Sequence, residues 1–326
     1  MLNKVLKILE YSRYFSLPMT IMSWSIIFVY SVLNSGNAQY GMIALAGICF
    51  VHLGTNLLDD FFDYKYLMKQ LDFDKTAYLQ NSQKTKCRYL ISGLISESQL
   101  FGILSVFFAL GLLCGLYLFL KCGVGILWFA LLGGVIAVTY PLASRICLSE
   151  MMVALAYGPA LFGGVYYAMT GAYSIDVLIL SIPSTIITVV LLYIHTVMDF
   201  EFDLNEGKNT IANRFDSQLD SLAILKFLLI TAYISVLLLC IFDIADWQVF
   251  MVFFTIPLAV DLYRSLQSFS ERSQETPVKR WYHFPMENWE KLKERNETSF
   301  MMRMYQSRNL MIYFSLFLAL GLVLAL

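Results

Sequence analysis

Two clusters of acidic residues interrupt an otherwise apolar chain and are its most informative chemical feature. The first cluster contains Asp59, Asp60 and Asp63, and the second contains Asp199 and Asp203. A four-residue spacing, as between Asp59 and Asp63, places both side chains on one face of a helix. Carboxylates so close repel each other unless a cation lies between them, and a site built only of oxygen ligands favours Mg²⁺. Because Mg²⁺ combines one or two carboxylates with substrate phosphates, the clusters predict a cleft that holds a diphosphate.

The segments around these acids have the composition of a membrane protein. The chain has 326 residues, of which 58% are hydrophobic and 14% charged, and its mean hydropathy is +0.64. Soluble domains carry about 25% charged residues. A carboxylate in or beside a bilayer is costly unless it is paired, bound to a metal or facing water, so both clusters are candidate functional sites. The alternative is that they are solvated helix ends that bind nothing.

Net charge and cysteine placement argue against two other kinds of site. The net charge of −1 leaves no basic surplus to displace counterions from a nucleic acid, so we expect no nucleic-acid partner. The six cysteines are scattered and show no CxxC or Cys/His spacing typical of a zinc site. We interpret them as small apolar residues of the hydrophobic segments.

Nine hydrophobic segments of about 20 residues predict nine transmembrane helices in one all-α domain over residues 1–326. The first segment lacks the cleavage site of a removable signal peptide. The stretch 265–307 is too polar to span a membrane, so we expect a connector at the cytoplasmic surface, with a lid or a partner-docking element as the alternative. The predicted segments are Tyr14–Leu33, Tyr40–Leu58, Leu100–Leu120, Gly123–Leu142, Met151–Thr170, Val177–Val197, Ile224–Phe242, Trp247–Tyr263 and Leu310–Leu326.

The positions of the lysines and arginines predict the orientation of these segments. With nine segments and the N-terminus inside, every Lys and Arg except Lys121 falls on the cytoplasmic side. Both acidic clusters then lie at cytoplasmic ends, after the second and the sixth segment. We therefore expect a multi-pass protein of the cytoplasmic membrane whose active-site loops face the cytosol.

A basic residue follows each acidic cluster, in a loose internal repeat. Arg88 lies in the loop after the second segment, and Lys208 lies in the loop after the sixth. A diphosphate carries more negative charge than one Mg²⁺ cancels, so Arg or Lys donors complete its neutralisation. The alternative is that both residues only fix the topology, but their position directly after the carboxylates favours ligand binding.

Together these motifs resemble the UbiA superfamily of intramembrane prenyltransferases over roughly residues 12–265. The first motif of that family, Asn-Asp-x-x-Asp, is similar to Asp59-Asp60-Phe-Phe-Asp63. Its Arg-x-x-x-Ser-Gly is similar to Arg88 with Ser92-Gly93. Its second motif, Asp-x-x-x-Asp followed by Gly-Lys-x-Thr, is matched by Asp199, Asp203, Gly207, Lys208 and Thr210.

The resemblance implies an enzyme that moves a polyprenyl group from its diphosphate to an aromatic acceptor. Aspartates of both motifs would hold Mg²⁺, Tyr140 would stabilise the allylic cation through its ring face, and apolar helix surfaces would hold the tail. The implied catalytic residues are Asp63, Asp199, Asp203 and Tyr140. The implied metal ligands are Asp59, Asp60, Asp63, Asp199 and Asp203, and the implied substrate-binding residues are Asn56, Arg88, Arg145, His195 and Lys208.

The chain departs from the family pattern four residues before the key aspartate of each motif. The family usually has Asn there, whereas this chain has Asp59 and His195. His195 would donate to phosphate or pack against Asp199; the alternative is an ordinary helix-end histidine. The distal acid of the first motif is also displaced, to Asp72 or Asp74. These departures affect the expected acceptor more than the expected reaction.

Shorter similarities predict the acceptor. Thr139-Tyr140-Pro141-Leu142, Leu148-Ser149-Glu150 and Tyr157-Gly158-Pro159 are most similar to the 1,4-dihydroxy-2-naphthoate branch, which makes menaquinone precursors. The open alternatives are 4-hydroxybenzoate, a glycerol phosphate ether precursor, or another phenol or polyol. Outside this enzyme class, a secondary transporter also uses inverted repeats and buried acids, and an inactive scaffold is the third possibility. Basic residues beside both clusters favour a phosphate ligand over transport.

Overall fold

Helices make up all regular structure in the part of the chain that the structure describes. The computed structural model describes residues 2–70, 73–80, 87–205, 209–271, 278–287, 289–294 and 298–325. Nine helices within these ranges are long and apolar enough to cross a membrane. The all-α, nine-helix architecture predicted from the sequence is therefore confirmed.

The nine spans follow the chain in order, and three of them are built from more than one helical element. The first four are η1 and α2 (Tyr14–Ser16 and Leu17–Leu33), α3 (Ala38–Leu67), α6 (Glu97–Cys122) and α7 (Ile126–Ala143). The fifth joins α8 (Ser149–Leu155), the π-helical turn η2 (Ala156–Ala160) and α9 (Leu161–Thr170). The last four are α10 (Ile175–Met198), α12 (Gln218–Ile241), η4 with α13 (Trp247–Thr255 and Ile256–Ser270) and α15 (Thr298–Leu324).

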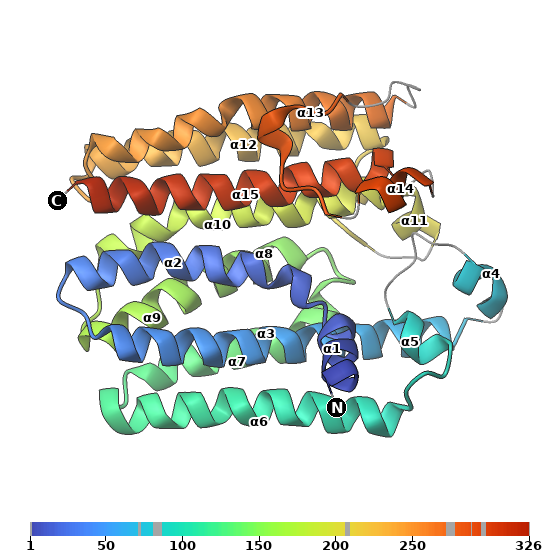
Figure 1. The fold of residues 1–326 in the computed structure, drawn as a ribbon, viewed down its shortest axis with the longest axis horizontal. Coiled ribbons are helices and arrows are strands. Elements are labelled where there is room, and N and C mark those ends of the chain that lie inside the picture. Colours follow the sequence, from blue (N-terminus) through green and yellow to red (C-terminus); the bar gives the residue numbers. More distant parts are fainter. Residues whose placement is uncertain are drawn as a thin grey trace.

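Short helices precede or connect the spans, and several of them gather at one end of the bundle. Helix α1 (Leu2–Tyr11) precedes the first span, and the connecting elements are α4 (Lys75–Gln80), α5 (Arg88–Ile91), α11 (Phe200–Asn205), η3 (Ala212–Arg214), η5 (Trp281–His283) and α14 (Trp289–Glu294). Figure 1 shows α4, α5, α11 and α14 at the right-hand end, where α3 and α10 also end. Both acidic clusters therefore belong to the same end of the bundle.

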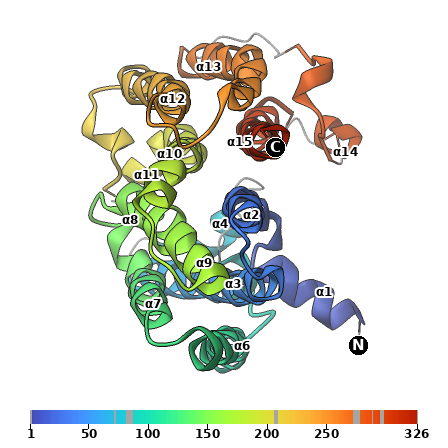
Figure 2. The ribbon, with the colours of Figure 1, turned by 90° about the vertical axis from the view of Figure 1, so that its left-hand side faces the viewer.

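The spans form an arc around a central region rather than a flat layer. Seen end-on in Figure 2, α13, α12, α10, α9, α7 and α6 follow one another along the arc, and α15, α2 and α3 lie on its inner side. The main packing pairs are α3 with α6, α10 with α12, and α15 with α2 and η4. Both α3 and α10 border this central region (Figure 2), so the first acidic cluster, on α3, and the second, directly after α10, each contribute residues to it.

Local sequence signals set several helix boundaries. The Asn37 side chain accepts from the backbone N–H of Gln39 at 2.9 Å and so caps the start of α3. Ser96 and Gln99 form a capping box at the start of α6. Gly171 ends α9 at a φ of 74°, a left-handed conformation that glycine adopts without steric cost. These signals define where the spans begin and end.

Two helices extend well beyond their predicted hydrophobic segments. Helix α3 continues to Leu67 rather than Leu58, so the first acidic cluster lies inside a helix. Helix α15 begins at Thr298 rather than Leu310, which shortens the predicted connector. Its first turns contain the polar residues Arg303 and Gln306, each 1% exposed. A hydropathy window stops at such residues because it cannot detect that other parts of the protein bury and bond them.

Candidate active site

A large cavity of about 1930 Å³ opens between α2, α3, α7, α10 and α15. Both acidic clusters contribute to its lining, although they are far apart in the sequence. The predicted site residues that line it are Asn56, Asp59, Asp63, Tyr140, Arg145, His195, Asp199 and Asp203. One cavity thus collects residues from α3, α7 and α10 together with the loop after α7.

The helical phase of α3 divides the first acidic cluster between two environments. Asp59 and Asp63 lie four residues apart and line the cavity, with 5% and 6% exposure. Asp60 is 1% exposed and accepts from the backbone N–H of Cys87 at 3.2 Å. Asp60 therefore faces the loop before α5, away from the region that Asp59 and Asp63 share.

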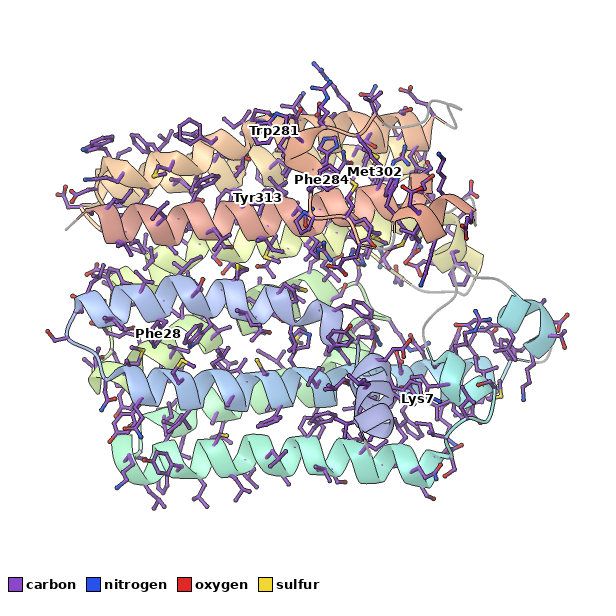
Figure 3. The ribbon with its side chains drawn as sticks, viewed as in Figure 1. Lys7, Phe28, Trp281, Phe284, Met302 and Tyr313 are labelled. Atoms are coloured by element: carbon purple, nitrogen blue, oxygen red, sulfur yellow. The ribbon has the colours of Figure 1, made fainter. Side chains whose placement is uncertain are left out.

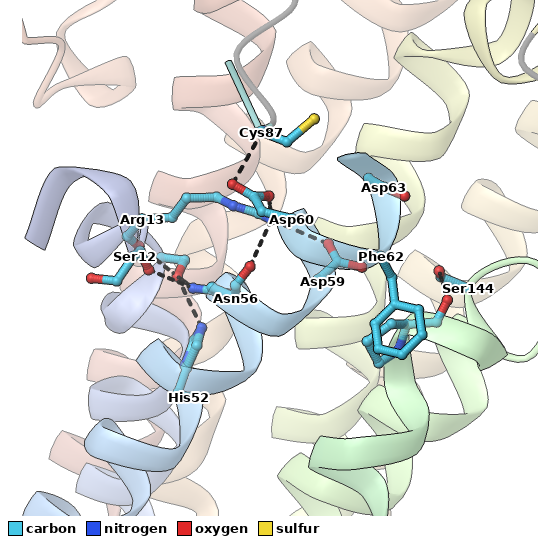
Figure 4. A network of polar contacts seen from close by, with 12 residues as sticks. Ser12, Arg13, His52, Asn56, Asp59, Asp60, Phe62, Asp63, Cys87 and Ser144 are labelled. Carbon is cyan, nitrogen blue, oxygen red and sulfur yellow. Dashed lines mark hydrogen bonds and ion pairs between the residues drawn. The ribbon is translucent and has the colours of Figure 1, made fainter. Parts of the chain in front are cut away.

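Arg13 joins the first cluster from the turn before η1. Its guanidinium lies 3.2 Å from Asp59, donates to Asp60 at close range, and also donates to the backbone carbonyl of Asn56 at 3.2 Å (Figure 4). Burial by itself lowers the pKa of Arg13, but the charges of Asp60 and Asp59 outweigh burial and raise that pKa above its usual value. Arg13 thus remains charged and neutralises much of the negative charge of this cluster.

A left-handed turn holds Arg13 in this position. Arg13 has a φ of 55°, a conformation that is unfavourable for most residues and must be fixed by neighbouring contacts. The Asn56 side-chain amide donates to the Ser12 carbonyl at 2.9 Å and to Ser16 Oγ at 3.0 Å, on either side of Arg13. Asn56 therefore supports the turn as well as lining the cavity.

Arg145 neutralises the other aspartate of the first cluster. Its guanidinium donates to Asp63 at 2.8 Å and lies 4.0 Å from the centre of the Tyr66 ring. Tyr66 follows Asp63 on α3, so the guanidinium is held between a carboxylate and an aromatic face. Arg145 thereby fixes the loop after α7 against the last turns of α3.

The second acidic cluster lies at a break between two helices. Asp199 follows the last residue of α10, and Asp203 lies in α11. The backbone N–H of Asp203 donates to the Asp199 carbonyl at 2.8 Å, so the chain keeps a helical spacing across the break. Asp203 is 6% exposed, Asp199 is half-buried, and His195 faces the cavity one turn earlier. The four-residue spacing expected for Asp199 and Asp203 is thus retained without a continuous helix.

The carboxylates of the cavity fit a hard divalent cation by type. Asp59 and Asp63 on one side, and Asp199 and Asp203 on the other, offer only oxygen ligands. Within the described ranges, no three His, Cys, Asp or Glu side chains lie together as a complete metal cluster. Two separated pairs suit the mode in which Mg²⁺ takes one or two carboxylates and completes its shell with phosphate and water.

Two of the predicted residues lie outside the cavity lining, and one lies outside the described residues. Of the residues that the structure describes, Asp60 and Arg88 are absent from the cavity lining, and Arg88 donates to the backbone carbonyl of Leu79. Lys208 lies outside the described residues, as does Asp72, the proposed displaced acid. The binding roles of Arg88 and Lys208 therefore stay predictions.

The cavity also has basic residues that were assigned only to topology or to the connector. Arg13 is one of them: it lies one residue before the first span, and the sequence gives no indication of its contact with the buried aspartates of α3. Arg303 and Arg308 of α15 are the others. Arg303 Nε donates to the Ser265 carbonyl at 2.8 Å, and Arg308 pairs with Glu287 at 3.2 Å. Both contacts connect α15 to neighbouring segments at the wall of the cavity.

The chain is similar to known membrane prenyltransferases. A sequence model described as the UbiA prenyltransferase family matches residues 17–289. A 2-carboxy-1,4-naphthoquinone phytyltransferase from Synechocystis sp. is 26% identical over 132 residues, which are 39% of this chain. That match spans only 41% of the length of the Synechocystis protein.

Solved structures share the whole fold at low sequence identity. A structure reported for digeranylgeranylglyceryl phosphate synthase has a TM-score of 0.59 and 16% identity, with 98% of this chain and 99% of that chain covered. A UbiA homolog from Aeropyrum pernix K1 has a TM-score of 0.60 and 15% identity over 91% of this chain and 96% of its own. A homolog from Archaeoglobus fulgidus bound to GPP and Mg²⁺ has a TM-score of 0.58 and 14% identity, covering 93% and 99%. With the family model matching most of its length, this chain belongs to the UbiA prenyltransferase family and is a multi-pass membrane protein.

Proposed function

We propose that the cavity is the active site for Mg²⁺-dependent transfer of a polyprenyl group from its diphosphate to an aromatic acceptor. One observation carries this proposal: the acidic clusters of α3 and α10 meet at one cavity whose remaining walls are largely apolar. A polyprenyl diphosphate has the same two parts, an anionic head and a hydrocarbon tail. A cavity with this division of polarity fits both parts of the donor at once.

Asp63, Asp199 and Asp203 are the residues we assign to the diphosphate head. When bound, Mg²⁺ neutralises the diphosphate and makes it a better leaving group. Arg145 pairs with Asp63 through part of its guanidinium, which has five N–H donors, so other donors remain for phosphate oxygens. Arg88 and Lys208 are proposed to supply further positive charge at the cytoplasmic rim. His195, on the same wall as Asp199, is proposed to donate to phosphate.

Tyr140 and the apolar walls are assigned to the prenyl group. Tyr140 is half-buried and lines the cavity on α7, where its ring face can stabilise positive charge at the first prenyl carbon. The tail would lie against apolar residues further into the bundle, including Leu118, Ile126 and Phe129. These side chains also exclude water, which would otherwise capture the allylic cation.

We propose 1,4-dihydroxy-2-naphthoate as the acceptor, which would place the enzyme in menaquinone biosynthesis. The motif similarities of residues 139–159 and the naphthoquinone-related name of the Synechocystis relative support this choice. The distribution of basic residues supports an N-terminus inside the cytoplasmic membrane, with the polar end of the cavity facing the cytosol. The partners are thus the two substrates and the surrounding lipid bilayer.

Purified protein in nanodiscs tests this function directly. Labelled polyprenyl diphosphates of several lengths are supplied with Mg²⁺ and one acceptor at a time: 1,4-dihydroxy-2-naphthoate, 4-hydroxybenzoate or a glycerol phosphate ether. We expect labelled product with the naphthoate and loss of product when EDTA removes Mg²⁺. Product with only the glycerol ether would contradict an aromatic acceptor, and no transfer to any acceptor would contradict the activity.

The variant Asp63→Asn tests the assignment of the diphosphate site. The substitution removes one negative charge from the cavity at nearly constant shape, and turnover should fall by about 100-fold or more. Asp176→Asn, an exposed change in the first turn of α10, is the matched control and should retain full turnover. Full turnover of a folded Asp63→Asn protein at saturating Mg²⁺ would remove Asp63 from the site.

A further inference from the structure

A second polar cluster lies in the same cavity, on the side of Asn56 away from the acids. It consists of His52 of α3, Ser16 and Thr20 at the start of the first span, and Tyr157 of η2, and we call it the His52 cluster. His52 Nε2 lies 2.9 Å from Ser16 Oγ. His52 Nδ1 lies 2.6 Å from Thr20 Oγ1 and 3.1 Å from the Tyr157 hydroxyl. All four residues line the cavity, and Figure 4 shows His52 on α3 below Asn56.

An irregular turn places Tyr157 in this cluster. Residues Ala156–Ala160 form a π-helical turn within the fifth span, and such turns are frequent at functional sites. Gly158 permits the close approach of α10, because a Cβ there would lie 2.9 Å from Thr185 Oγ1. The wider turn and the close packing together direct the Tyr157 hydroxyl to His52. The distortion therefore has a defined polar target inside the cavity.

The hydrogen bonds of the cluster have a definite direction. Ser16 Oγ has one proton, which it donates to the Arg13 carbonyl at 2.8 Å. Its oxygen therefore accepts from His52, which assigns the proton of a neutral imidazole to Nε2 and makes Nδ1 an acceptor. Thr20 is closest to Nδ1 and donates to it.

With the hydrogen bonds in this direction, the Tyr157 oxygen remains as a hydrogen-bond acceptor for a ligand. The Tyr157 hydroxyl lies 3.3 Å from Thr20 Oγ1 and 3.1 Å from His52 Nδ1. Because Thr20 donates its own proton to Nδ1, the Thr20 oxygen can accept from Tyr157, and in this arrangement the Tyr157 proton points to Thr20. What Tyr157 offers to the cavity is an oxygen lone pair. A ligand that completes this cluster must supply a hydrogen-bond donor.

The position of the His52 cluster along α3 suits binding of the aromatic acceptor substrate rather than binding of the diphosphate. His52 precedes Asp59 by seven residues and Asp63 by eleven, so it lies about 10 Å and about 16 Å further into the bundle along the helix. If the diphosphate head of the donor is held at Asp63, its first prenyl carbon points further into the bundle, toward the level of the His52 cluster. Tyr140, assigned to the same carbon, lines the cavity here as well.

We propose that the His52 cluster binds a hydroxyl group of the aromatic acceptor, with Tyr157 as the contact and His52 as a positioning residue. This inference rests on the proposed function and adds its acceptor subsite. The ligand class is a phenol or hydroquinone, because a quinone carbonyl has no proton to donate to Tyr157. Binding through one hydroxyl fixes the ring beside the first prenyl carbon, where the attacking carbon must lie within contact distance.

The variant Tyr157→Phe removes this contact and keeps the ring. With 1,4-dihydroxy-2-naphthoate or 4-hydroxybenzoate as the probe, the KM for the acceptor should rise about 3- to 10-fold, the range for one neutral hydrogen bond. Binding of prenyl diphosphate with Mg²⁺, measured by calorimetry without acceptor, should not change. Thr55→Val is the matched control: Thr55 also lines the cavity on α3, but its hydroxyl donates to the Val51 carbonyl at 2.8 Å.

Methyl ethers of the same aromatic acceptors distinguish loss of the Tyr157 contact from a general disruption of the site. The wild type should prefer the free hydroxyl over one of its monomethyl ethers, and Tyr157→Phe should lose that preference. His52→Gln, which can still accept through its side chain, should retain more of the preference than His52→Leu. The inference is overturned if Tyr157→Phe discriminates between hydroxyl and ether as the wild type does, or if His52→Leu weakens prenyl diphosphate binding as much as it raises the acceptor KM. Failure of the proposed function differs: the wild type then prenylates no phenol at all, which overturns both.

Discussion

At the scale of single residues, Arg13 decides how much negative charge remains for a ligand. Asp59 and Asp60 are adjacent and buried on α3, and two such carboxylates are unfavourable without a cation. Arg13 contacts both, and its side chain is only 22% exposed. One guanidinium cancels one of these two negative charges. The other acidic residues of the cavity lining are Asp63, itself paired with Arg145, the second cluster, Glu201 and Glu287.

Replacing Arg13 should therefore destabilise the protein as well as its site. Arg13→Gln leaves two buried carboxylates without their cation, and breaking a buried pair in this way costs about 3–5 kcal/mol. We expect a clear fall in Tm, measured by intrinsic fluorescence of the purified protein in detergent. Lys7→Gln removes an exposed charge from the same terminal segment (Figure 3) and should leave Tm unchanged. Equal Tm values for the two variants would show that Arg13 only fixes topology.

Lys208 tests whether a rim cation touches the diphosphate. Lys208→Gln removes one positive charge from a loop that keeps others, so the orientation in the membrane should survive. If Lys208 donates to phosphate, prenyl diphosphate binding should weaken by about 1.5–3 kcal/mol, while acceptor binding changes little. Calorimetry with Mg²⁺ and each substrate measures both effects. Lys226→Gln, an exposed change on α12, is the control, and identical affinities for all three proteins would remove Lys208 from the site.

Spacing along one helix could be predicted from the sequence, but contacts between helices could not. The four-residue interval placed Asp59 and Asp63 on one face of α3, and the structure has them lining one cavity. Arg13 and His52 gave no comparable signal, because their partners lie on other helices. Helical periodicity is a local property, whereas a polar network depends on which faces the fold brings together.

At the scale of elements, hydropathy located every span but misplaced some of their ends. The first span was predicted and found at Tyr14–Leu33. Helix α15 begins well before its predicted start because its polar first turns are buried against other segments, including Ser265. The π-helical turn at Ala156–Ala160 was also unpredictable, since its helical hydrogen-bond register depends on packing against α10.

The connector before α15 packs against the sides of two spans. Asn309 of α15 donates to the carbonyls of His283 at 2.7 Å and Pro285 at 2.9 Å. His283 Nε2 lies 3.2 Å from Asp261 of α13. Figure 3 shows Trp281 and Phe284 on this part of the connector, and Trp281 is 85% exposed. Such irregular backbone is tolerated beside a bilayer because the helices satisfy its polar groups.

Docking of this connector should weaken as the pH falls. Burial lowers the pKa of His283, and the contact with Asp261 offsets this only in part. In the released connector, His283 has the ordinary histidine pKa of about 6.5. Below that pH, His283 binds a proton more readily in the released form than in the docked form, so protonation favours release. A spin label at the exposed Val278 should therefore become more mobile between pH 7.5 and pH 5.5, both chosen to be about one unit from that pKa. His283→Gln should abolish this change, and an unaltered pH response in that variant would exclude His283 as its cause.

At the scale of the whole molecule, the proposed function requires both clusters to reach one end of the bundle. The first cluster lies on α3, and the second lies at the end of α10 and in α11. Three spans lie between α3 and α10, and this odd number makes the two helices run in the same direction. The UbiA homologs of known structure share this fold. The sequence assigns almost all basic residues to the loops of that end, which predicts that this end faces the cytosol.

This orientation predicts which loops are accessible from outside the cell. Single cysteines introduced near Asn37, Ala172 or Ala245, in the loops at the end away from the acids, should react with a membrane-impermeant maleimide added to intact cells. The labelling background is a variant whose native cysteines are replaced. Cysteines near Gln80 or Gly207 should react only after the membrane is opened, because the positively charged loops remain inside. Permeabilised cells provide the control for reactivity at every site. Outside labelling near Gly207 would place the diphosphate site on the wrong side of the membrane for a substrate supplied from the cytosol.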